Sequence, residues 1–335
     1  MNEVALLDEL ADAALKRKVF PGCVIGVTRS GGEQAFFCYG STKDGGTDVT
    51  RDTVYDLASV TKSIPVAALA ALFISENRLR LHDLVRTYIP ELQNDYGATI
   101  EDLLRYRVIG PRLSTLSFTT FEEIRTHIFE TGFEGPPREV SYANVPAYLL
   151  GVVLERVGGA MLPALSHRYL FAPVGMEQTT FFPSASNCAP TEIGHDAVEV
   201  CGIVHDESAR IFARARRAVG HAGLFSTAFD LSKFLSQLLK PTDEFLGSNA
   251  RSILDLAQEG LGWSVNQEWF MGKYASERTI GKTGFTGTSV LVDLEKEIGI
   301  VILSNRTYPK RPSDATSLTS DINRFRKGVA DILLS

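Results

Sequence analysis

The chain has 335 residues, of which 44% are hydrophobic and 22% are charged, a composition typical of a globular protein with a large core. The formal net charge is −6, and because phosphate recognition needs clustered Lys and Arg, we expect no nucleic-acid partner. The densest basic cluster comprises Arg210, Arg214, Arg216 and Arg217, and we interpret it as a solvated loop.

The N-terminal region predicts one helix followed by a β-hairpin. Apolar residues recur at helical spacing over residues 3–17, and Phe20-Pro21-Gly22 ends this helix. Residues 23–28 and 34–39 are rich in strand-forming side chains. Ser30-Gly31-Gly32 between them supplies a permissive turn, so the two strands are expected to pair as a hairpin.

The middle of the chain predicts mostly helices. A long apolar helix is expected from Ser59 to about residue 77, with Pro65 kinking its first turns. Thr99 stands three residues before Asp102, and Thr120 three before Glu123, which is the spacing of helix N-terminal capping boxes. Further helices are expected over residues 145–157, 162–170 and 227–239.

The C-terminal region returns to strands and ends in a helix. Strands are expected over residues 261–266, 278–282, 288–294 and 298–304, and a final helix over about 314–334. Strands near both ends with helices between them favour an α+β fold in which one antiparallel sheet joins the two ends. We expect a single domain over 1–335. Its sheet lobe covers about 1–58 and 258–335, and its helical lobe about 59–257, with a ligand cleft between the lobes.

Targeting signals are not evident. The first nine residues include three acidic side chains, Glu3, Asp8 and Glu9, and no basic one. A secretory signal instead needs a positively charged start before its apolar stretch. The longest apolar run, 64–74, is far shorter than the ~20 residues of a membrane helix, so no membrane span is expected. We expect a cytoplasmic protein, or a periplasmic or extracellular one if an export signal preceded this sequence.

The cysteines predict neither a metal site nor a disulfide framework. Cys23, Cys38, Cys188 and Cys201 form no Cys-x-x-Cys pair, and no Cys/His grouping has zinc spacing. Cys23 and Cys38 lie in apolar strand-like runs, where buried free thiols are common. A disulfide between them across the hairpin is the alternative, and the expectation of a reducing compartment argues against it.

The segment Ser59-Val60-Thr61-Lys62 is the first candidate for chemistry. Residues three apart on a helix share a face, so the Ser59 hydroxyl and the Lys62 amine are expected within hydrogen-bond reach. A serine hydroxyl becomes a strong nucleophile when a base takes its proton, and a lysine with a lowered pKa can act as that base. A helix cap followed by a surface lysine is the alternative, but the apolar run 66–73 predicts a helix buried on all sides.

Tyr142-Ala143-Asn144, just before a predicted helix, is the second candidate. A tyrosine beside two lysines can become a phenolate or pass protons between the nucleophile and the leaving group. The Asn144 amide can hold a substrate carbonyl and the lysine amine. A turn tyrosine followed by a helix cap is the alternative interpretation.

The third candidate is Lys282-Thr283-Gly284, at the end of a predicted strand. Together with Gly281 it superficially suggests a phosphate loop. That motif needs a glycine where Ser276 stands and a helix afterwards, whereas a strand is predicted here, so a nucleotide site is not expected.

An edge strand lining a cleft explains the same segment better. Lys282 would supply positive charge, Thr283 a hydroxyl for a substrate carboxylate, and Gly284 a close approach of the backbone. The main-chain N–H of Phe285 could then complete an oxyanion hole with that of Ser59.

The ordered set Ser-x-x-Lys, Tyr-x-Asn and Lys-Thr-Gly resembles the serine β-lactamases and penicillin-binding proteins. The tyrosine of the second motif points to the class C-like branch, which includes D,D-peptidases and related esterases. The resemblance runs along nearly the whole chain, and it also covers residues 56–59, 220–226 and 284–288. It implies the α+β fold of β-lactamases and transpeptidases, with no metal and no organic cofactor.

The resemblance also implies roles for the matching residues. Carried over, it makes Ser59 the nucleophile, Lys62 and Tyr142 the acid–base pair, and Asn144, Lys282 and Thr283 substrate contacts. Residues 105–110 depart from the His-Thr-Ser-Gly stretch of many relatives, and the stretch before Gly220 is rich in arginine instead of glycine. Both differences could alter the rim of the cleft and so the substrate range. Many esterase-like relatives carry histidine at position 282, so lysine there favours substrates that bear a carboxylate.

The expected reaction is acylation of Ser59 by an ester, D-amino-acid peptide or β-lactam carbonyl of a small molecule or short peptide, followed by hydrolysis of the acyl-enzyme. A catalytically silent protein that binds penicillins or peptidoglycan fragments is the alternative of a different class. A Ser-His-Asp triad using His205, Asp206 or His221 is the competing enzyme mechanism, but the Gly-x-Ser-x-Gly elbow is absent, so structural hydrogen bonding is expected for both histidines. Nothing in the sequence indicates the oligomeric state.

Overall fold

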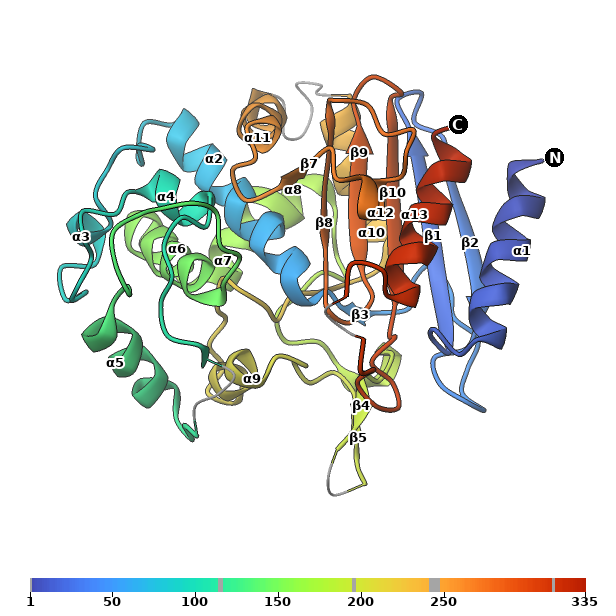
Figure 1. Ribbon diagram of the computed structural model, residues 1–335, viewed down its shortest axis with the longest axis horizontal. Coiled ribbons are helices and arrows are strands. Elements are labelled where there is room, and N and C mark those ends of the chain that lie inside the picture. The colour runs from blue at the N-terminus through green and yellow to red at the C-terminus, as the bar shows by residue number, and fades with distance from the viewer. Residues whose placement is uncertain (1, 114–116, 195–196, 241–247, 315–316) are drawn as a thin grey trace.

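The computed structural model describes residues 2–113, 117–194, 197–240, 248–314 and 317–335. At its centre lies an antiparallel sheet with the strand order β2-β1-β10-β9-β8-β7 (Figure 1). Strands from both ends of the chain lie side by side, because β1 pairs with β10 from Cys23 opposite Ser304 to Arg29 opposite Ile298. The strands are β1 Gly22–Arg29, β2 Gln34–Gly40, β7 Ser264–Val265, β8 Thr279–Thr283, β9 Ser289–Asp293 and β10 Ile298–Ser304. The α+β fold with a sheet built from both chain ends is therefore confirmed.

Helices cover both faces of the sheet. On one face α1 (Glu3–Lys16) packs against α13 (Asp321–Leu333), and their apolar side chains form a core with β1 and β10. The opposite face is covered by α10 (Ala228–Leu239), which contacts β1, β9 and β10. The central strands β1 and β10 are buried on both sides, which explains why they read as continuous apolar runs instead of alternating patterns.

The apolar helix expected after Ser59 forms as three short segments, with bounds 58–62, 63–67 and, as α2, 68–75. The break falls at Ile64, which has φ −118° and ψ 110°. A residue that precedes proline is sterically pushed out of the α conformation, so Pro65 causes the break that the sequence predicted. Residues 58–75 are apolar and long enough to resemble a membrane helix, but 83% of this stretch is buried inside the protein as the central core helix.

Helices α3, α4, α6 and α7 lie on the side of α2 away from the terminal helices, whereas α12 packs against α13 (Figure 1). Both predicted capping boxes form, because Thr99 and Thr120 each accept from the backbone N–H three residues on and Asp102 and Glu123 bond back. The remaining α-helices are α3 Val85–Tyr88, α4 Ile100–Leu104, α5 Phe121–Thr131, α6 Asn144–Gly158, α7 Leu162–Ser166, α8 Ala172–Val174, α9 Glu207–Arg214, α11 Ser248–Gln258 and α12 Glu268–Met271.

Several sequence predictions were wrong in extent or kind. The arginine cluster is not a loop throughout: Arg210 and Arg214 lie on α9, while Arg216 and Arg217 follow its end. The final helix begins at Asp321, after a turn in which Ser317 side-chain and backbone oxygens accept N–H groups that a helix would otherwise use. The sequence analysis did not predict four helices, α3, α9, α11 and α12. It also did not predict two short strand pairs, which are β3–β6 (Tyr55–Asp56 with Phe225–Ser226) and β4–β5 (Glu192–Ile193 with Glu199–Val200).

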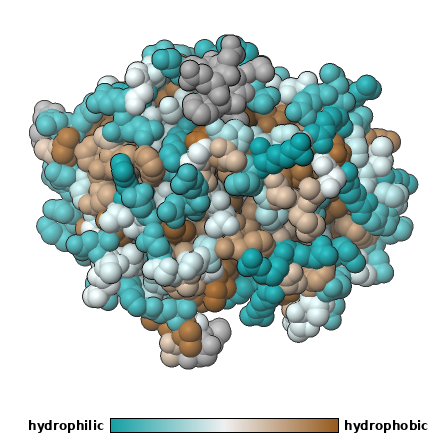
Figure 2. Space-filling view, turned by 180° about the vertical axis from the view of Figure 1, so that it is seen from behind, coloured by the Kyte–Doolittle hydropathy of each residue, from teal (hydrophilic) through white to brown (hydrophobic). Residues whose placement is uncertain are grey.

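The β4–β5 hairpin projects from the lower edge of the molecule in Figure 1. Seen from behind in Figure 2, this edge carries apolar surface beside residues of uncertain placement. Ile193, Val198 and Ile203, on or beside the hairpin, are the exposed apolar residues of this region. The rest of the surface in that view is a mixture of hydrophilic and apolar residues.

Candidate active site

Ser59 is the second residue of the first helical segment (58–62), which follows β3 after one residue, and its side chain is partly exposed. Residues 56–59 are called the serine turn below. The preceding Ala58 has φ +45°, a left-handed conformation that is uncommon for a residue other than glycine. The conformation is held by hydrogen bonds from Ala58 N–H to Asp56 Oδ1 (2.8 Å) and from Thr61 Oγ1 to the Ala58 carbonyl (2.7 Å). Burial raises the pKa of Asp56 to about 6, although the N–H groups of His205 and Ala58 oppose this.

The loop after β8 clamps the same turn from the sheet side. Thr286 and Thr288 donate through their hydroxyls to the carbonyls of Asp56 (2.6 Å) and Leu57 (3.0 Å). Gly284 stands directly against this backbone, since a Cβ there would lie 2.3 Å from the Leu57 oxygen. Only glycine fits at this point, and β8 is thereby brought close to the serine turn.

Lys62 is 1% exposed and lies beside Ser59. Its Nζ donates to Ser59 Oγ over 2.9 Å and to the backbone carbonyl of His221 over 2.9 Å. The pair therefore occupies one face of the helical turn, at hydrogen-bond distance, and the segment around His221 fixes the direction of the amine.

Tyr142 lies between two lysines. The Nζ atoms of Lys62 and Lys282 are 5.1 Å and 4.7 Å from the centre of its ring. The residue is 55% exposed, yet its hydroxyl is desolvated, which by itself would raise its pKa. The two lysines, with hydrogen bonds involving Ser59 and Lys62, outweigh this effect and lower the pKa of Tyr142 to about 8.

A second tyrosine, Tyr106, completes this group and was missed as a site residue by the sequence analysis. It is buried, its ring centre is 5.1 Å from that of Tyr142, and Lys282 Nζ lies 4.9 Å from it. Lys282 is therefore held between two aromatic rings. Burial lowers the pKa of Lys282, Tyr142 opposes this, and Lys62 lowers it further. Tyr106 lies within the 105–110 segment, which the sequence marked only as a departure from the family pattern.

Thr283 and Phe285 flank Gly284 at the end of β8. The Thr283 hydroxyl makes no hydrogen bond to any residue that the structure describes. The Phe285 ring stacks on His205, with centroids 5.7 Å apart. The backbone N–H groups of Phe285 and Ser59 have no acceptor among the described residues, as an oxyanion hole requires.

Asn144 does not contact the lysine amine, as the sequence analysis had suggested. Its Nδ2 donates to Asp206 Oδ2 over 3.3 Å, and Asp206 also lies 3.3 Å from His221 Nε2 and caps α9. Because the His221 carbonyl accepts from Lys62, Asn144 is connected to the amine only through two further residues. The His221 ring pulls the pKa of Asp206 well below its usual range, against the effect of burial.

The arrangement of Ser208, His221 and Asp206 is not that of a catalytic serine triad. Ser208 Oγ and Asp206 Oδ1 both contact Nε2 of His221, at 3.0 Å and 3.3 Å, whereas a catalytic triad uses opposite ring nitrogens. Ser208 is also buried, so it cannot reach a substrate. The role of His221 here is structural.

Nothing in the described residues groups three or more His, Cys, Asp or Glu side chains as a metal site would. Cys23, Cys38, Cys188 and Cys201 are free thiols.

Comparisons with known proteins identify the family of the chain. The family model described as Beta-lactamase matches residues 7–321. A protein of Salmonella gallinarum provisionally named D-alanyl-D-alanine carboxypeptidase is 28% identical over 311 residues, which cover 77% of this chain and 71% of that protein.

Solved structures share the fold over nearly the whole chain. EstCE1, a hydrolase with promiscuous acyltransferase activity, superposes with a TM-score of 0.77 at 19% identity. A β-lactamase/D-alanine carboxypeptidase from Pseudomonas syringae gives a TM-score of 0.76 at 20% identity. Each match covers 99% of this chain and 98% of the other. At these identities the likeness establishes the fold alone.

Proposed function

Because this chain belongs to the β-lactamase family of hydrolases, we propose that it is a serine hydrolase that forms an acyl-enzyme on Ser59. Its preferred substrates would carry a carboxylate next to the scissile carbonyl, as D-alanyl-D-alanine peptides do. The observation that carries the proposal is the placement of Ser59 Oγ 2.9 Å from Lys62 Nζ, with Tyr142 held between Lys62 and Lys282.

Acylation would begin with attack of Ser59 Oγ on the substrate carbonyl carbon. The hydroxyl proton passes to the Tyr142 phenolate, which Lys62 and Lys282 stabilise. The N–H groups of Ser59 and Phe285 donate to the oxyanion of the tetrahedral intermediate. When the carbonyl carbon's bond to the leaving group breaks, Tyr142 returns the proton to the departing amine or alkoxide.

Deacylation would use the same residues in reverse. Water attacks the acyl carbon, its proton passes to Tyr142, and the bond to Ser59 Oγ breaks as that oxygen regains a proton. Lys62 donates to Ser59 Oγ and to the His221 carbonyl, so it orients the nucleophile, and its charge helps to lower the pKa of Tyr142.

The charge of the site supports a substrate carboxylate. Lys282 is 5% exposed and has no carboxylate within ion-pair distance in the described part of the chain. A buried ammonium without an anionic partner is unfavourable, and a substrate carboxylate between Lys282 and the Thr283 hydroxyl would compensate it. The provisional name of the Salmonella relative refers to a substrate of this kind.

The substrate class is tested by comparing an acylated D-alanyl-D-alanine peptide with its C-terminal amide. We expect kcat/KM for the carboxylate to exceed that for the amide by about tenfold or more, and this ratio to fall toward one in Lys282→Gln. Lys16→Gln, a change at an exposed lysine on α1, is the matched control.

Three other outcomes separate the alternatives. Equal turnover of both peptides would remove the carboxylate preference. Turnover of a nitrophenyl ester without either peptide would leave a hydrolase of simple esters. Failure to form any acyl-enzyme with peptide, ester or penicillin would contradict the hydrolase proposal and favour a silent binding protein.

A further inference from the structure

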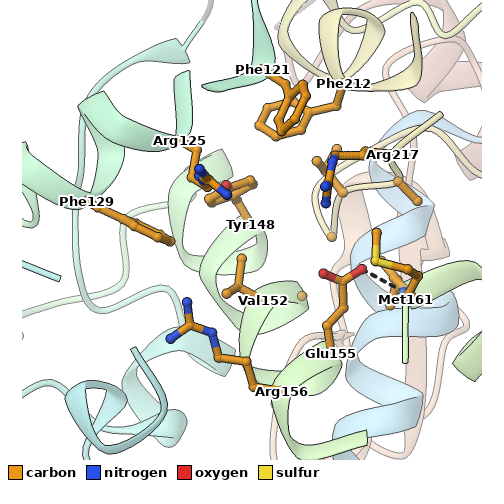
Figure 3. A pocket seen from close by; sticks show the side chains of 15 residues that line it. Phe121, Arg125, Phe129, Tyr148, Val152, Glu155, Arg156, Met161, Phe212 and Arg217 are labelled. Atoms are coloured by element: carbon orange, nitrogen blue, oxygen red, sulfur yellow. Dashed lines mark hydrogen bonds between the residues drawn. The ribbon is translucent and has the colours of Figure 1, made fainter. Parts of the chain in front are cut away.

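A cavity of about 150 Å³ lies behind the proposed catalytic residues, between α5, α6 and the segment that follows α9 (Figure 3). Its walls come from Phe121 and Arg125 on α5, from Tyr148 and Glu155 on α6, and from Arg217. None of the residues proposed for catalysis lines it. The cavity has a charged side and an apolar side.

The charged side has a surplus of positive charge. Arg156 is paired with Glu91, and the Glu155 carboxylate accepts from Leu162 N–H over 2.7 Å. The side chains of Arg125 and Arg217 are exposed, and neither makes an ion pair or hydrogen bond with any residue that the structure describes. The Arg217 guanidinium stacks over the Phe121 ring, and its charge opposes the rise that burial causes in the pKa of Glu155. Figure 3 shows their guanidinium groups on either side of Tyr148. Two arginines are thus available to an anion.

Tyr148 adds a hydrogen-bond donor at the cavity wall. The residue is 3% exposed, and its hydroxyl makes no hydrogen bond within the described ranges. Burial raises its pKa, so it remains a neutral O–H donor. Because Tyr148 lines the cavity, a ligand oxygen there could accept from its hydroxyl.

The apolar side is aromatic. Phe212 lies 5.8 Å from Phe121 and 5.5 Å from Tyr148 between ring centres, and Val152 and Met161 complete the wall. A cavity of about this volume accommodates a single benzene ring. The aromatic wall and the unpaired cations lie on one cavity, so a ligand with an aromatic body and one anionic end matches both.

We propose that this cavity is a second ligand site, which binds a small aromatic carboxylate. The carboxylate accepts from Arg125, Arg217 and the Tyr148 hydroxyl, and the ring packs against Phe121 and Phe212.

The cavity shares no lining residue with the proposed acyl site, but the two are adjacent along the chain. The cavity floor includes Val219 and Gly220, and the next residue is His221, whose carbonyl accepts from Lys62. Gly220 packs so closely on α6 that a Cβ added to it would lie 2.1 Å from the Ala147 oxygen.

Methionine methyl labelling gives a direct readout, because the chain has only four methionines and Met161 is on the cavity wall. Benzoate and its neutral analogue benzamide would be titrated into Ser59→Ala protein, which cannot turn over substrate. We expect benzoate to shift the Met161 signal to saturation with little change at Met176 and Met271, which are buried elsewhere. Benzamide should bind about tenfold more weakly.

Variants locate the binding groups. We expect Arg125→Gln and Arg217→Gln each to weaken benzoate binding about tenfold, and Tyr148→Phe to weaken it several-fold. Arg168→Gln, at an exposed arginine that also stacks on a tyrosine, should leave it unchanged. An absent Met161 shift, equal binding of benzoate and benzamide, or unchanged affinity in the Arg125 and Arg217 variants would overturn the proposal.

Discussion

The reactivity proposed for this protein depends on four charged or ionisable side chains. Lys62 and Lys282 lie on either side of Tyr142, and their positive charge lowers the pKa of the phenol against the effect of its desolvation. Lys62 Nζ donates to Ser59 Oγ over 2.9 Å, so the nucleophile is held by the same lysine that lies beside Tyr142, the proposed proton acceptor. Near-neutral ionisation of a tyrosine is the chemical property that this cluster creates.

The pH dependence of kcat/KM should therefore report Tyr142. The phenolate is the proton acceptor, so activity should rise with pH through an apparent pKa of about 8. Replacing Lys282 with Met removes one of the lowering charges, and the rising limb should move to higher pH. An ester substrate without a carboxylate separates this effect from substrate binding. A limb that stays in place in Lys282→Met would show that Tyr142 is not the titrating group.

Tyr106 should act as a positioning residue for Lys282. Its aromatic face lies against the Lys282 ammonium. Tyr106→Phe keeps this face, so kcat/KM should stay within about twofold of wild type, whereas Tyr106→Ala should lower it about tenfold, the scale of a desolvated cation–π contact. The pH limb should also move in the alanine variant only. Equal loss in both variants would instead indicate that the Tyr106 hydroxyl matters.

At the scale of elements, the site depends on how closely β8 approaches the serine turn. Gly284→Ala would place a Cβ 2.3 Å from the Leu57 oxygen and 2.2 Å from Thr288 Oγ1, so β8 must move away from Ser59. A displacement of β8 by about 1 Å should lower kcat about a hundredfold. Gly31→Ala, in the open turn of the β1–β2 hairpin where nothing lies within 4 Å, is the control and should retain activity. Retained activity in Gly284→Ala would contradict the tight apposition.

The sequence predicted elements well where local chemistry determines them. The capping boxes at Thr99 and Thr120 and the break before Pro65 follow from residues a few positions apart. Helix α9 was missed because only Ser208, Ala209 and Phe212 on it are buried, so its apolar periodicity is hidden among charged residues.

At the scale of the whole molecule, the C-terminal helix supports the site directly. Arg326 on α13 is buried and donates through Nη2 to the carbonyls of Gly284 (2.8 Å) and Thr288 (2.7 Å). These residues bracket the loop that clamps the serine turn. Burial, together with the nearby charge of Arg306, lowers the pKa of Arg326 to about 9.

Arg326→Met should cost both stability and activity. It leaves two carbonyls without their donor, which should lower the free energy of unfolding by about 3 kcal/mol. Urea denaturation measures this, and Arg324→Met, an exposed neighbour on the same helix, is the control. An unchanged unfolding midpoint in Arg326→Met would contradict a supporting role for α13.

The order of the three motifs along the chain predicted the family. The positions of the predicted strands near both chain ends predicted the sheet that joins them. The contacts that refine the site could not be predicted in that way. These contacts depend on which distant segments of the chain pack together. They are the Asn144–Asp206 hydrogen bond, the Tyr106–Lys282 contact and the cavity beside Tyr148.

The central claim, acylation of Ser59, is tested most directly by the intact mass of the protein. Wild type and Ser59→Ala would be incubated separately with a fluorescent penicillin and with a short-chain nitrophenyl ester. We expect wild type to gain the mass of one acyl group or to release nitrophenol, and Ser59→Ala to do neither. Equal labelling or turnover in Ser59→Ala would contradict the assignment of the nucleophile, and the absence of both in wild type would contradict the hydrolase itself.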